Sequence, residues 1–439
     1  MKDREDEIAY EHTRYLVEEC GERIAGSAEM NKAISYVEGV FDSLGMEKKV
    51  EPFQVPRCIT KKSHVAVHID DSWLEIANTN VCFAKDTPEG GITAQAVYIP
   101  CEKYSMGLIG EIYPLKEEQL GEKIRDKIVI LGRNILMDYP DVDSYKILEK
   151  YHALAVIFTT SEKQMGIPYV YANYETSRES YTIPSFVIHD SDAQKLVSLD
   201  QIELHLEVET EIVECESENV IGVLQGTDLA DEIIMISGHL DSAVSSKGAV
   251  DDAGAIGTVL ALAEKYKGLY DMGVRPRRTM YFACWSGHEP GLQGSKYFIQ
   301  GNPEIYRRLR FNLNYDIIGM PTPIGATYLG TEIHEEWIKE SVKKGGYDWE
   351  VCSGPVPCDT MNVTSRKVPS ITLSASDANF CHTPNDNMEK VEVEGFTEVI
   401  GFSSEFLDLL NQQDEIAQEY QNEMIDQIQV YIRRYKWDF

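Results

Sequence analysis

The sequence predicts an α/β protein with a doubly wound, mostly parallel sheet, helices on both faces, and an inserted β-rich domain. Three observations support this fold class. An amphipathic helix is predicted near the start of the 439-residue chain, short β-like runs dominate residues 56–215, and strands alternate with helices from about residue 216 onward. Alternation of this last kind is typical of a parallel sheet that helices cover on both faces.

The first predicted element is an amphipathic helix over residues 28–45. Ile34, Val37 and Phe41 recur at helical spacing. Gly45 stands where a helix often ends in a glycine cap. The helix therefore has an apolar face that must be covered by another part of the molecule.

Residues 56–215 have a different texture, in which aspartate, proline and glycine separate short β-like runs. Residues 145–151 predict a helix that leads into a buried strand, so we expect a mostly β module with one or two short helices. The β-like runs are HVAVHI, AQAVYI, KIVIL, ALAVIF and IPSFVI.

From residue 216 onward, the predicted strands and helices alternate. We expect residues 1–55 and 216–439 to form one domain, with residues 56–215 inserted into it as a second. Ligands of such sheets gather beyond the carboxyl ends of the strands. The predicted strands are ENVIGVL, EIIMISGHL, TMYFACW, FNLNYDIIG and PSITLS, and the predicted helices are 253–266, 291–300 and 393–410.

Charge and composition exclude several classes of partner. The chain has 73 acidic and 41 basic side chains, a formal net charge of −32. Such a field repels phosphate backbones and anionic membranes, so we expect neither nucleic-acid nor membrane partners. No apolar run reaches the roughly 18 residues of a membrane span. The composition leaves self-association into a homo-oligomer open.

The amino-terminal residues and the cysteines favour a cytoplasmic protein. Residues 1–20 carry charges throughout and lack the apolar core of a secretory signal. The nine cysteines are odd in number and include no CxxC pair. Scattered thiols of this kind are expected in a reducing compartment.

Five residues that could bind metal fall at strand ends or in the loops that follow them. Each signal is weak alone, because a single histidine at a strand end is usually structural and an Asp-Asp before a helix is usually a cap. Their joint occurrence at one edge of the predicted sheet indicates a metal site. The residues are His239, Asp251, Glu289, Asp316 and His382.

The residue types of this set indicate which metal it would bind. Two imidazoles and three carboxylates suit zinc, with manganese or cobalt as alternatives. Asp241 lies two positions after His239. We expect its carboxylate to accept the second N–H of that imidazole and so to orient it.

These segments resemble the five motif blocks of the co-catalytic zinc aminopeptidase family, which includes bacterial leucyl aminopeptidases, glutamate carboxypeptidase, glutaminyl cyclases and the transferrin-receptor ectodomain. The resemblance implies two divalent ions with Asp251 as the bridging ligand and a cis peptide bond between Asp251 and Asp252. One ion would also take His239 and Asp316, and the other Glu289 and His382. It further implies that residues 56–215 form a protease-associated insert domain. The segments are GHLDS, GAVDDAGA, EPGLQGS, NYDIIG and HTPND.

One position departs from the family pattern. Hydrolytic members carry two adjacent glutamates, of which the first moves the proton and the second binds metal, whereas this chain has His288 followed by Glu289. An imidazole can act as a general base, become an additional metal ligand, or simply pack in the loop. In addition, Cys381 stands where several carboxypeptidase-like members have a tyrosine before the last histidine.

The resemblance predicts a dinuclear metal-dependent hydrolase of a peptide or small amide bond, with His288 as its proton-transfer group. Two alternatives remain open. The chain could catalyse a non-hydrolytic reaction, such as an elimination or a cyclisation, on the same metals. It could also be a non-catalytic member of the family.

Overall fold

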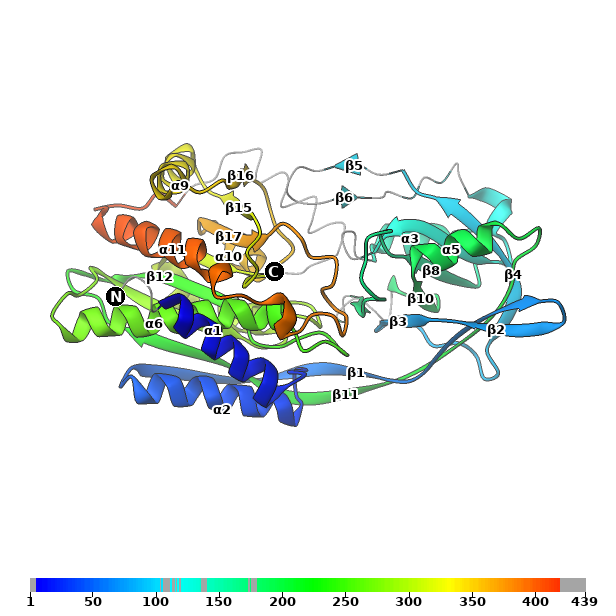
Figure 1. Ribbon diagram of the computed structural model, residues 1–439, viewed down its shortest axis with the longest axis horizontal. Coiled ribbons are helices and arrows are strands. Elements are labelled where there is room, and N and C mark those ends of the chain that lie inside the picture. Colours follow the sequence, from blue (N-terminus) through cyan, green and yellow to red (C-terminus); the bar gives the residue numbers. More distant parts are fainter. Residues whose placement is uncertain are drawn as a thin grey trace.

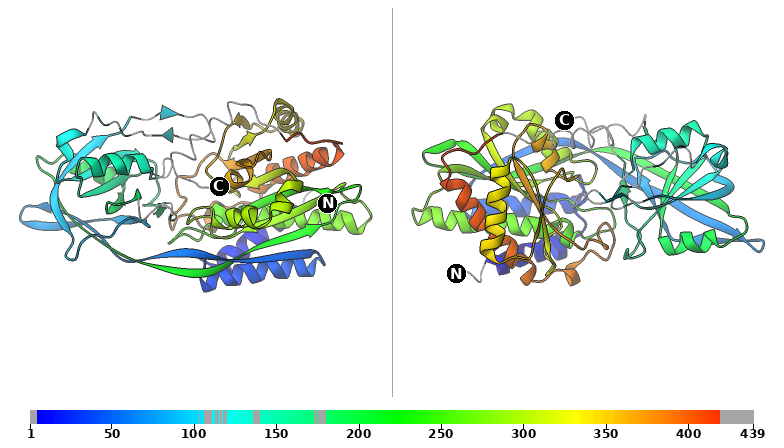
Figure 2. Two further views of the ribbon diagram at one scale, coloured as in Figure 1. Left: turned by 180° about the vertical axis from the view of Figure 1, so that it is seen from behind. Right: turned by 90° about the horizontal axis from the view of Figure 1, so that it is seen from above.

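The computed structural model consists of two lobes joined by a long two-stranded ribbon (Figure 1). The ribbon is formed by β1 (Glu47–Ile69) and β11 (Glu203–Leu224), which pair antiparallel along most of their length. Two further views show the same two-lobed shape (Figure 2). The described residues are 5–102, 104–105, 111–112, 115, 117, 120–135, 140–172, 174 and 180–418.

The larger lobe is built on a mixed sheet. Its further strands are β12 (Leu229–His239), β13 (Arg278–Trp285), β14 (Leu309–Tyr315), β15 (Ile324–Leu329), β16 (Glu350–Ser353) and β17 (Ser370–Ala375). Their order is β16-β15-β17-β14-β12-β13-β11, with β1 paired to β11. The central strands β17, β14, β12 and β13 are parallel neighbours, so their carboxyl ends meet at one edge.

Helices cover both faces of this sheet, because side chains alternate along each strand. Ile234 and Ile236 of β12 join the apolar cluster under one group of helices, whereas Ile233 and Met235 face the other group. The first group is α1 (Glu5–Tyr15), α2 (Ala28–Ser43), α6 (Gly254–Asp271), α9 (Glu332–Gly345) and α11 (Glu394–Gln412). The second group is α7 (Gln293–Gly301), α8 (Pro303–Arg308) and α10 (Thr360–Thr364).

The helix predicted over residues 28–45 is α2. The Ser27 side chain caps its start by accepting the backbone N–H of Met30 at 3.0 Å. Its apolar stripe is buried against the sheet, with Val37 and Phe41 fully covered. Gly45 has a φ of +64° just past the end of the helix, as the sequence predicted.

The smaller lobe carries a sheet in the order β4-β7-β8-β10-β3-β9, continuous with β11 through β4. The strands β4, β7, β8 and β10 are parallel, and α3 and α5 cover opposite faces. The elements of this lobe are β2 (Ser72–Ile76), β3 (Asn78–Cys82), β4 (Ile92–Pro100), β5 (Tyr104–Ser105), β6 (Glu111–Ile112), η4 (Gly121–Ile124), β7 (Ile128–Asn134), α3 (Val142–Lys150), β8 (Ala155–Thr159), β9 (Val170–Tyr171), β10 (Ser185–Ile188) and α5 (Asp190–Val197).

The predicted α/β class is confirmed, including the helices on both faces of the central sheet. The two predicted domain boundaries fall opposite each other inside the ribbon, where Val55 pairs with Cys215. No helix in the described part of the chain is both long and apolar enough to cross a membrane. Three short helices complete the larger lobe: η1 (Leu16–Cys20), η5 (Ala249–Ala253) and η6 (Met388–Lys390).

Candidate metal centre

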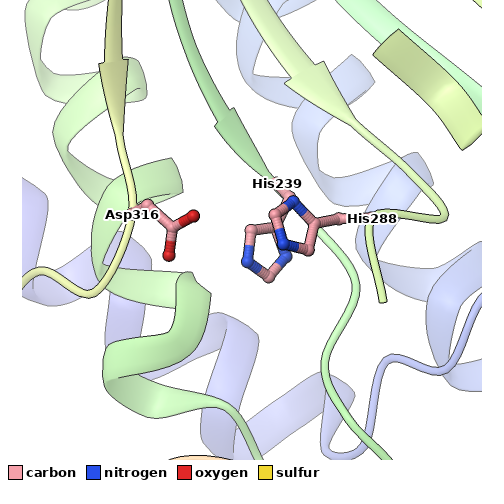
Figure 3. A group of neighbouring side chains, drawn as sticks. All are labelled: His239, His288 and Asp316. Carbon is pink, nitrogen blue, oxygen red and sulfur yellow. The ribbon is translucent and has the colours of Figure 1, made fainter. Parts of the chain in front are cut away.

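The five predicted ligands come together at the carboxyl edge of the parallel strands. Together with His288 they form two groups of three residues, and in each group one potential ligand atom per residue lies within 4.8 Å of the others. One group contains His239 and Asp316 together with His288, as Figure 3 shows, and the other contains Asp251, Glu289 and His382. Four of the five ligands are buried, and Asp316 is partly exposed.

The fold explains why residues so distant in sequence meet here. His239 is the last residue of β12, and Asp316 directly follows β14. Glu289 lies in the loop after β13, and Asp251 lies in η5, between β12 and α6. His382 belongs to the loop that follows β17. Each ligand therefore follows one of the central parallel strands, as the sequence predicted.

Asp251 lies between the two groups. Its Oδ1 is 3.1 Å from Nε2 of His239, and its Oδ2 is 3.3 Å from Nε2 of His382. Nε2 of His382 is also 3.4 Å from Oε2 of Glu289. One carboxylate thus presents an oxygen to each group, which is the arrangement that a bridging ligand requires. The peptide bond between Asp251 and Asp252 is cis, as the family resemblance implied.

The electrostatics of the site fit bound cations. Burial raises the pKa of Glu289 to about 7, and its Oε1 is buried with no hydrogen-bond partner among the described residues. Burial alone would lower the pKa of His382, but the nearby carboxylates of Glu289 and Asp251 outweigh it and raise the pKa to about 10. An uncompensated buried carboxylate oxygen is costly, and a divalent cation would satisfy it.

Two ligand imidazoles are held by backbone carbonyls. Nδ1 of His239 lies 3.0 Å from the carbonyl oxygen of Asp241, and Nδ1 of His382 lies 2.8 Å from that of Tyr169 in the smaller lobe. A carbonyl only accepts, so each Nδ1 must carry the hydrogen. In the neutral imidazoles each Nε2 then has the lone pair, directed toward the predicted ligand carboxylates, as metal binding requires.

The expected role of the Asp241 carboxylate needs correction. It lies 3.7 Å from Nδ1 of His239, beyond hydrogen-bond distance, and the carbonyl oxygen of Asp241 takes that N–H instead. The carboxylate instead accepts the backbone N–H groups of His288 and Glu289, each at 3.0 Å. Asp241 thus holds the loop that carries the second group's glutamate.

Asp241 is one of three buried carboxylates that hold ligand-bearing segments in the same way. Each accepts two backbone N–H groups, which fixes the path of the chain rather than a side chain. Sequence reasoning missed two of them, because their partners lie far away along the chain. Asp252 accepts from His239 and Ile317 at 3.1 Å each, and Asp386 accepts from Val250 at 2.8 Å and from Asp251 at 3.1 Å.

His288 stacks on His239. The ring centroids are 3.8 Å apart and the planes differ by 14°. A nitrogen lone pair lies in the plane of its own ring, so an ion in the plane of His239 would lie roughly 3.5 Å off the plane of His288, given ordinary contact distances. In this orientation His288 does not direct a lone pair at an ion held by His239.

Asp359 holds His288 in this orientation. Its Oδ2 lies 2.8 Å from Nδ1 of His288, and its Oδ1 accepts a hydrogen bond from Ser295. Asp359 is 1% exposed. Burial alone would raise its pKa, but His288 outweighs that effect and the pKa lies below its usual value. The contact between Asp359 and His288 could not be predicted from the sequence.

The sheet and its ligand-bearing edge define an α/β protein with the fold of zinc aminopeptidases. The structure of a zinc aminopeptidase from Bacillus subtilis matches with a TM-score of 0.70 and 19% identity, covering 95% of this chain and 98% of that one. The structure of a Peptidase M28 precursor from Shewanella amazonensis SB2B matches with a TM-score of 0.77 and 20% identity, over 96% of this chain and 100% of that one.

Sequence comparison points to the same class. Residues 219–406, which contain all five predicted ligands, match the model of the family described as Peptidase family M28. Carboxypeptidase Q of Mus musculus is 23% identical over 343 residues, 76% of this chain and 69% of its own length. Aminopeptidase YwaD of Bacillus subtilis is 23% identical over 408 residues, 88% of this chain and 80% of its own length. The prediction of a metal-dependent, peptidase-like hydrolase is thereby confirmed at the level of enzyme class.

Proposed function

We propose that the protein is a dinuclear metal-dependent hydrolase of the aminopeptidase or carboxypeptidase type that acts on a peptide or small amide bond. The position of the Asp251 carboxylate between two ligand groups carries this proposal. The names of the relatives, a carboxypeptidase and an aminopeptidase, support a peptide bond as the target. We expect two zinc ions, with manganese or cobalt as alternatives.

The ligand residues and His288 would divide the chemistry between them. Two bound divalent ions would polarise the scissile carbonyl and lower the pKa of the attacking water. The ligand side chains, most of which are buried, would hold these ions. Nε2 of His288 would accept the proton of the attacking water and return it to the leaving amine. The contact between Nδ1 of His288 and Asp359 leaves Nε2 available for that task.

Turnover by the full-length protein tests the proposal. We expect purified protein to cleave one or more substrates in a panel of dipeptides, aminoacyl anilides and acyl amino acids. Chelation should abolish this activity, and zinc, manganese or cobalt should restore it. Two equivalents of metal per chain should give the maximal rate. Failure of the metal-loaded protein to cleave any amide in the panel would contradict the proposal.

His288 itself supports a second candidate, a non-hydrolytic reaction on the same metals, because the carboxylate that serves hydrolysis in the family is missing. The substitution His288→Glu distinguishes the two. A hydrolase whose imidazole replaces the glutamate should tolerate the change and retain measurable amide cleavage. A lyase or cyclase should lose its native reaction. The five assembled ligands argue against a third option, a non-catalytic scaffold, because a scaffold has no need for them.

Three further expectations remain predictions. They are a protease-associated identity for residues 56–215, a cytoplasmic setting, and self-association. Turnover and chelation do not address them, so each needs its own measurement, such as sedimentation for the oligomeric state.

A further inference from the structure

We propose that Asp359 is a positioning residue that fixes the tautomer and ring orientation of His288, so that Nε2 faces the metal centre as a base. This inference rests on the proposed function. It assigns a role in proton transfer to a residue that binds no metal.

The contacts of Asp359 account for both oxygens of its carboxylate. Oδ2 takes Nδ1 of His288 at 2.8 Å, and Oδ1 takes the hydroxyl of Ser295. Nδ2 of Asn362 donates to the Ser295 hydroxyl oxygen at 2.8 Å and to the carbonyl oxygen of Leu292 at 3.2 Å. Asp359, Ser295 and Asn362 are all buried. The carboxylate is therefore held on the side away from His288 and has little freedom to turn.

The position of Asp359 in the fold would ordinarily suggest a structural role. It directly precedes α10, where an aspartate usually caps the helix by accepting a backbone N–H. Here its side chain makes no capping hydrogen bond. The carboxylate is directed instead at His288. A residue that served only to start the helix would be expected to accept a backbone N–H of the first helical turn with its carboxylate.

The chemistry of the pair sets the proton positions. An ionised carboxylate only accepts, so Nδ1 of His288 must carry a hydrogen, and in the neutral imidazole Nε2 has the lone pair. Stacking on His239 restricts the ring further. Without Asp359, the ring could adopt the other tautomer or turn over. Either change would remove the basic nitrogen from the metal side.

A double-mutant cycle on the zinc-loaded, full-length protein tests this role. We expect Asp359→Ala to lower kcat on the best amide substrate by roughly 10- to 100-fold with little change in KM. Asp359→Asn should retain part of the rate, because its amide oxygen can still accept the Nδ1 hydrogen. In a His288→Gln background, Asp359→Ala should change kcat less than about 2-fold, because no imidazole is left to position. Asp348→Asn, at an exposed position, is the charge-matched control.

A spectroscopic measurement makes the test independent of turnover. With 15N-labelled histidine, the His288 resonances are identified by their loss in His288→Gln. We expect the Nδ1–H tautomer in the unaltered protein, and a different tautomer or a mixture in Asp359→Ala. An Nε2–H tautomer in the unaltered protein would overturn the inference, as would an equal loss of kcat in both backgrounds. If no amide is cleaved but the tautomer depends on Asp359, the proposed function fails and the positioning role stands.

Discussion

At the scale of single residues, the three imidazoles of the site differ in what holds their Nδ1 atoms. His239 and His382 face neutral backbone carbonyls, whereas His288 faces the carboxylate of Asp359. A neutral acceptor fixes orientation only. An anionic acceptor also stabilises the positive charge that an imidazole acquires when it takes up a proton. The residue suited to proton transfer is therefore the one with the charged partner.

The loop-holding carboxylates lead to a first prediction. Asp386→Asn leaves only one accepting oxygen for the backbone N–H groups of Val250 and Asp251. We expect metal affinity to fall by roughly 10- to 100-fold, because the bridging ligand loses its fixed position. We also expect a loss of about 1–3 kcal/mol in the free energy of unfolding. Competition with a zinc-chelating dye measures the affinity, and denaturation measures the stability.

Asp348→Asn removes one carboxylate from an exposed position and serves as the matched control. It should leave the zinc affinity unchanged. An equal effect of both substitutions would mean that net charge, and not the hold on the loop, determines metal binding.

The sequence identified ligands better than it identified their supports. His239 and Asp316 could be recognised because each ends or follows a predicted strand, and strand ends share an edge. The role of Asp359 could not be, because it lies 71 positions from His288 and its direction depends on packing around α10. For Asp241, the sequence placed the residue correctly but assigned the hydrogen bond to the wrong group, since spacing does not say which oxygen faces the ring.

At the scale of elements, the start of α9 contains a histidine that should make stability depend on pH. Nδ1 of His334 accepts the backbone N–H of Thr331 at 3.0 Å, and the side chain is fully buried. Nε2 has no hydrogen-bond partner among the described residues. Burial lowers the pKa of His334 to about 4. The folded protein therefore resists protonation at this site.

A second prediction follows from that pKa. Unfolding returns His334 to its ordinary pKa of about 6.5, so below that pH the unfolded chain binds a proton that the folded chain does not. This contribution to stability is present above pH 6.5 and is lost as the pH falls toward 4. Between pH 7 and 5.5 the loss should be about 1 kcal/mol in the free energy of unfolding.

The variant His334→Gln isolates this contribution, because glutamine at the same position can still cap the helix. Urea denaturation of both proteins at pH 7 and 5.5 should show a smaller pH effect in the variant. The same pH dependence in both proteins would show that His334 is not responsible.

Strand length was the element-level feature that the sequence did not reveal. The sequence predicted short β-like runs such as HVAVHI, whereas β1 is continuous through Pro52 and Pro56. Proline is tolerated in an edge strand because its missing N–H faces away from the neighbour. In that part of the molecule β1 pairs only with β11, so both prolines fit within one 23-residue strand.

At the scale of the whole molecule, the metal centre should be a main source of stability. Chelation would remove the divalent charge beside the carboxylates of Asp251 and Glu289, which would then be offset by the imidazole of His382. A ligand that binds only the folded state stabilises it in proportion to the logarithm of its excess over Kd. We predict that removal of metal lowers Tm by at least about 5 °C.

Thermal unfolding before and after exhaustive dialysis against chelator measures this effect, and zinc should reverse it. Magnesium, which prefers oxygen ligands and retains its waters, is the control and should restore little. An unchanged Tm after verified metal loss would show that the centre does not contribute to folding.

The hydrogen bond between Nδ1 of His382 and the carbonyl oxygen of Tyr169 spans the two lobes, with the N–H of Tyr169 donating back to the carbonyl oxygen of His382 at 3.0 Å. A motion of the ribbon that separated the lobes there would break this pair and remove the acceptor that orients the imidazole of His382. Lobe opening and metal binding would then be thermodynamically coupled. Metal binding would favour the closed arrangement of the lobes, and a substrate that separated the lobes would lower the affinity for the metal.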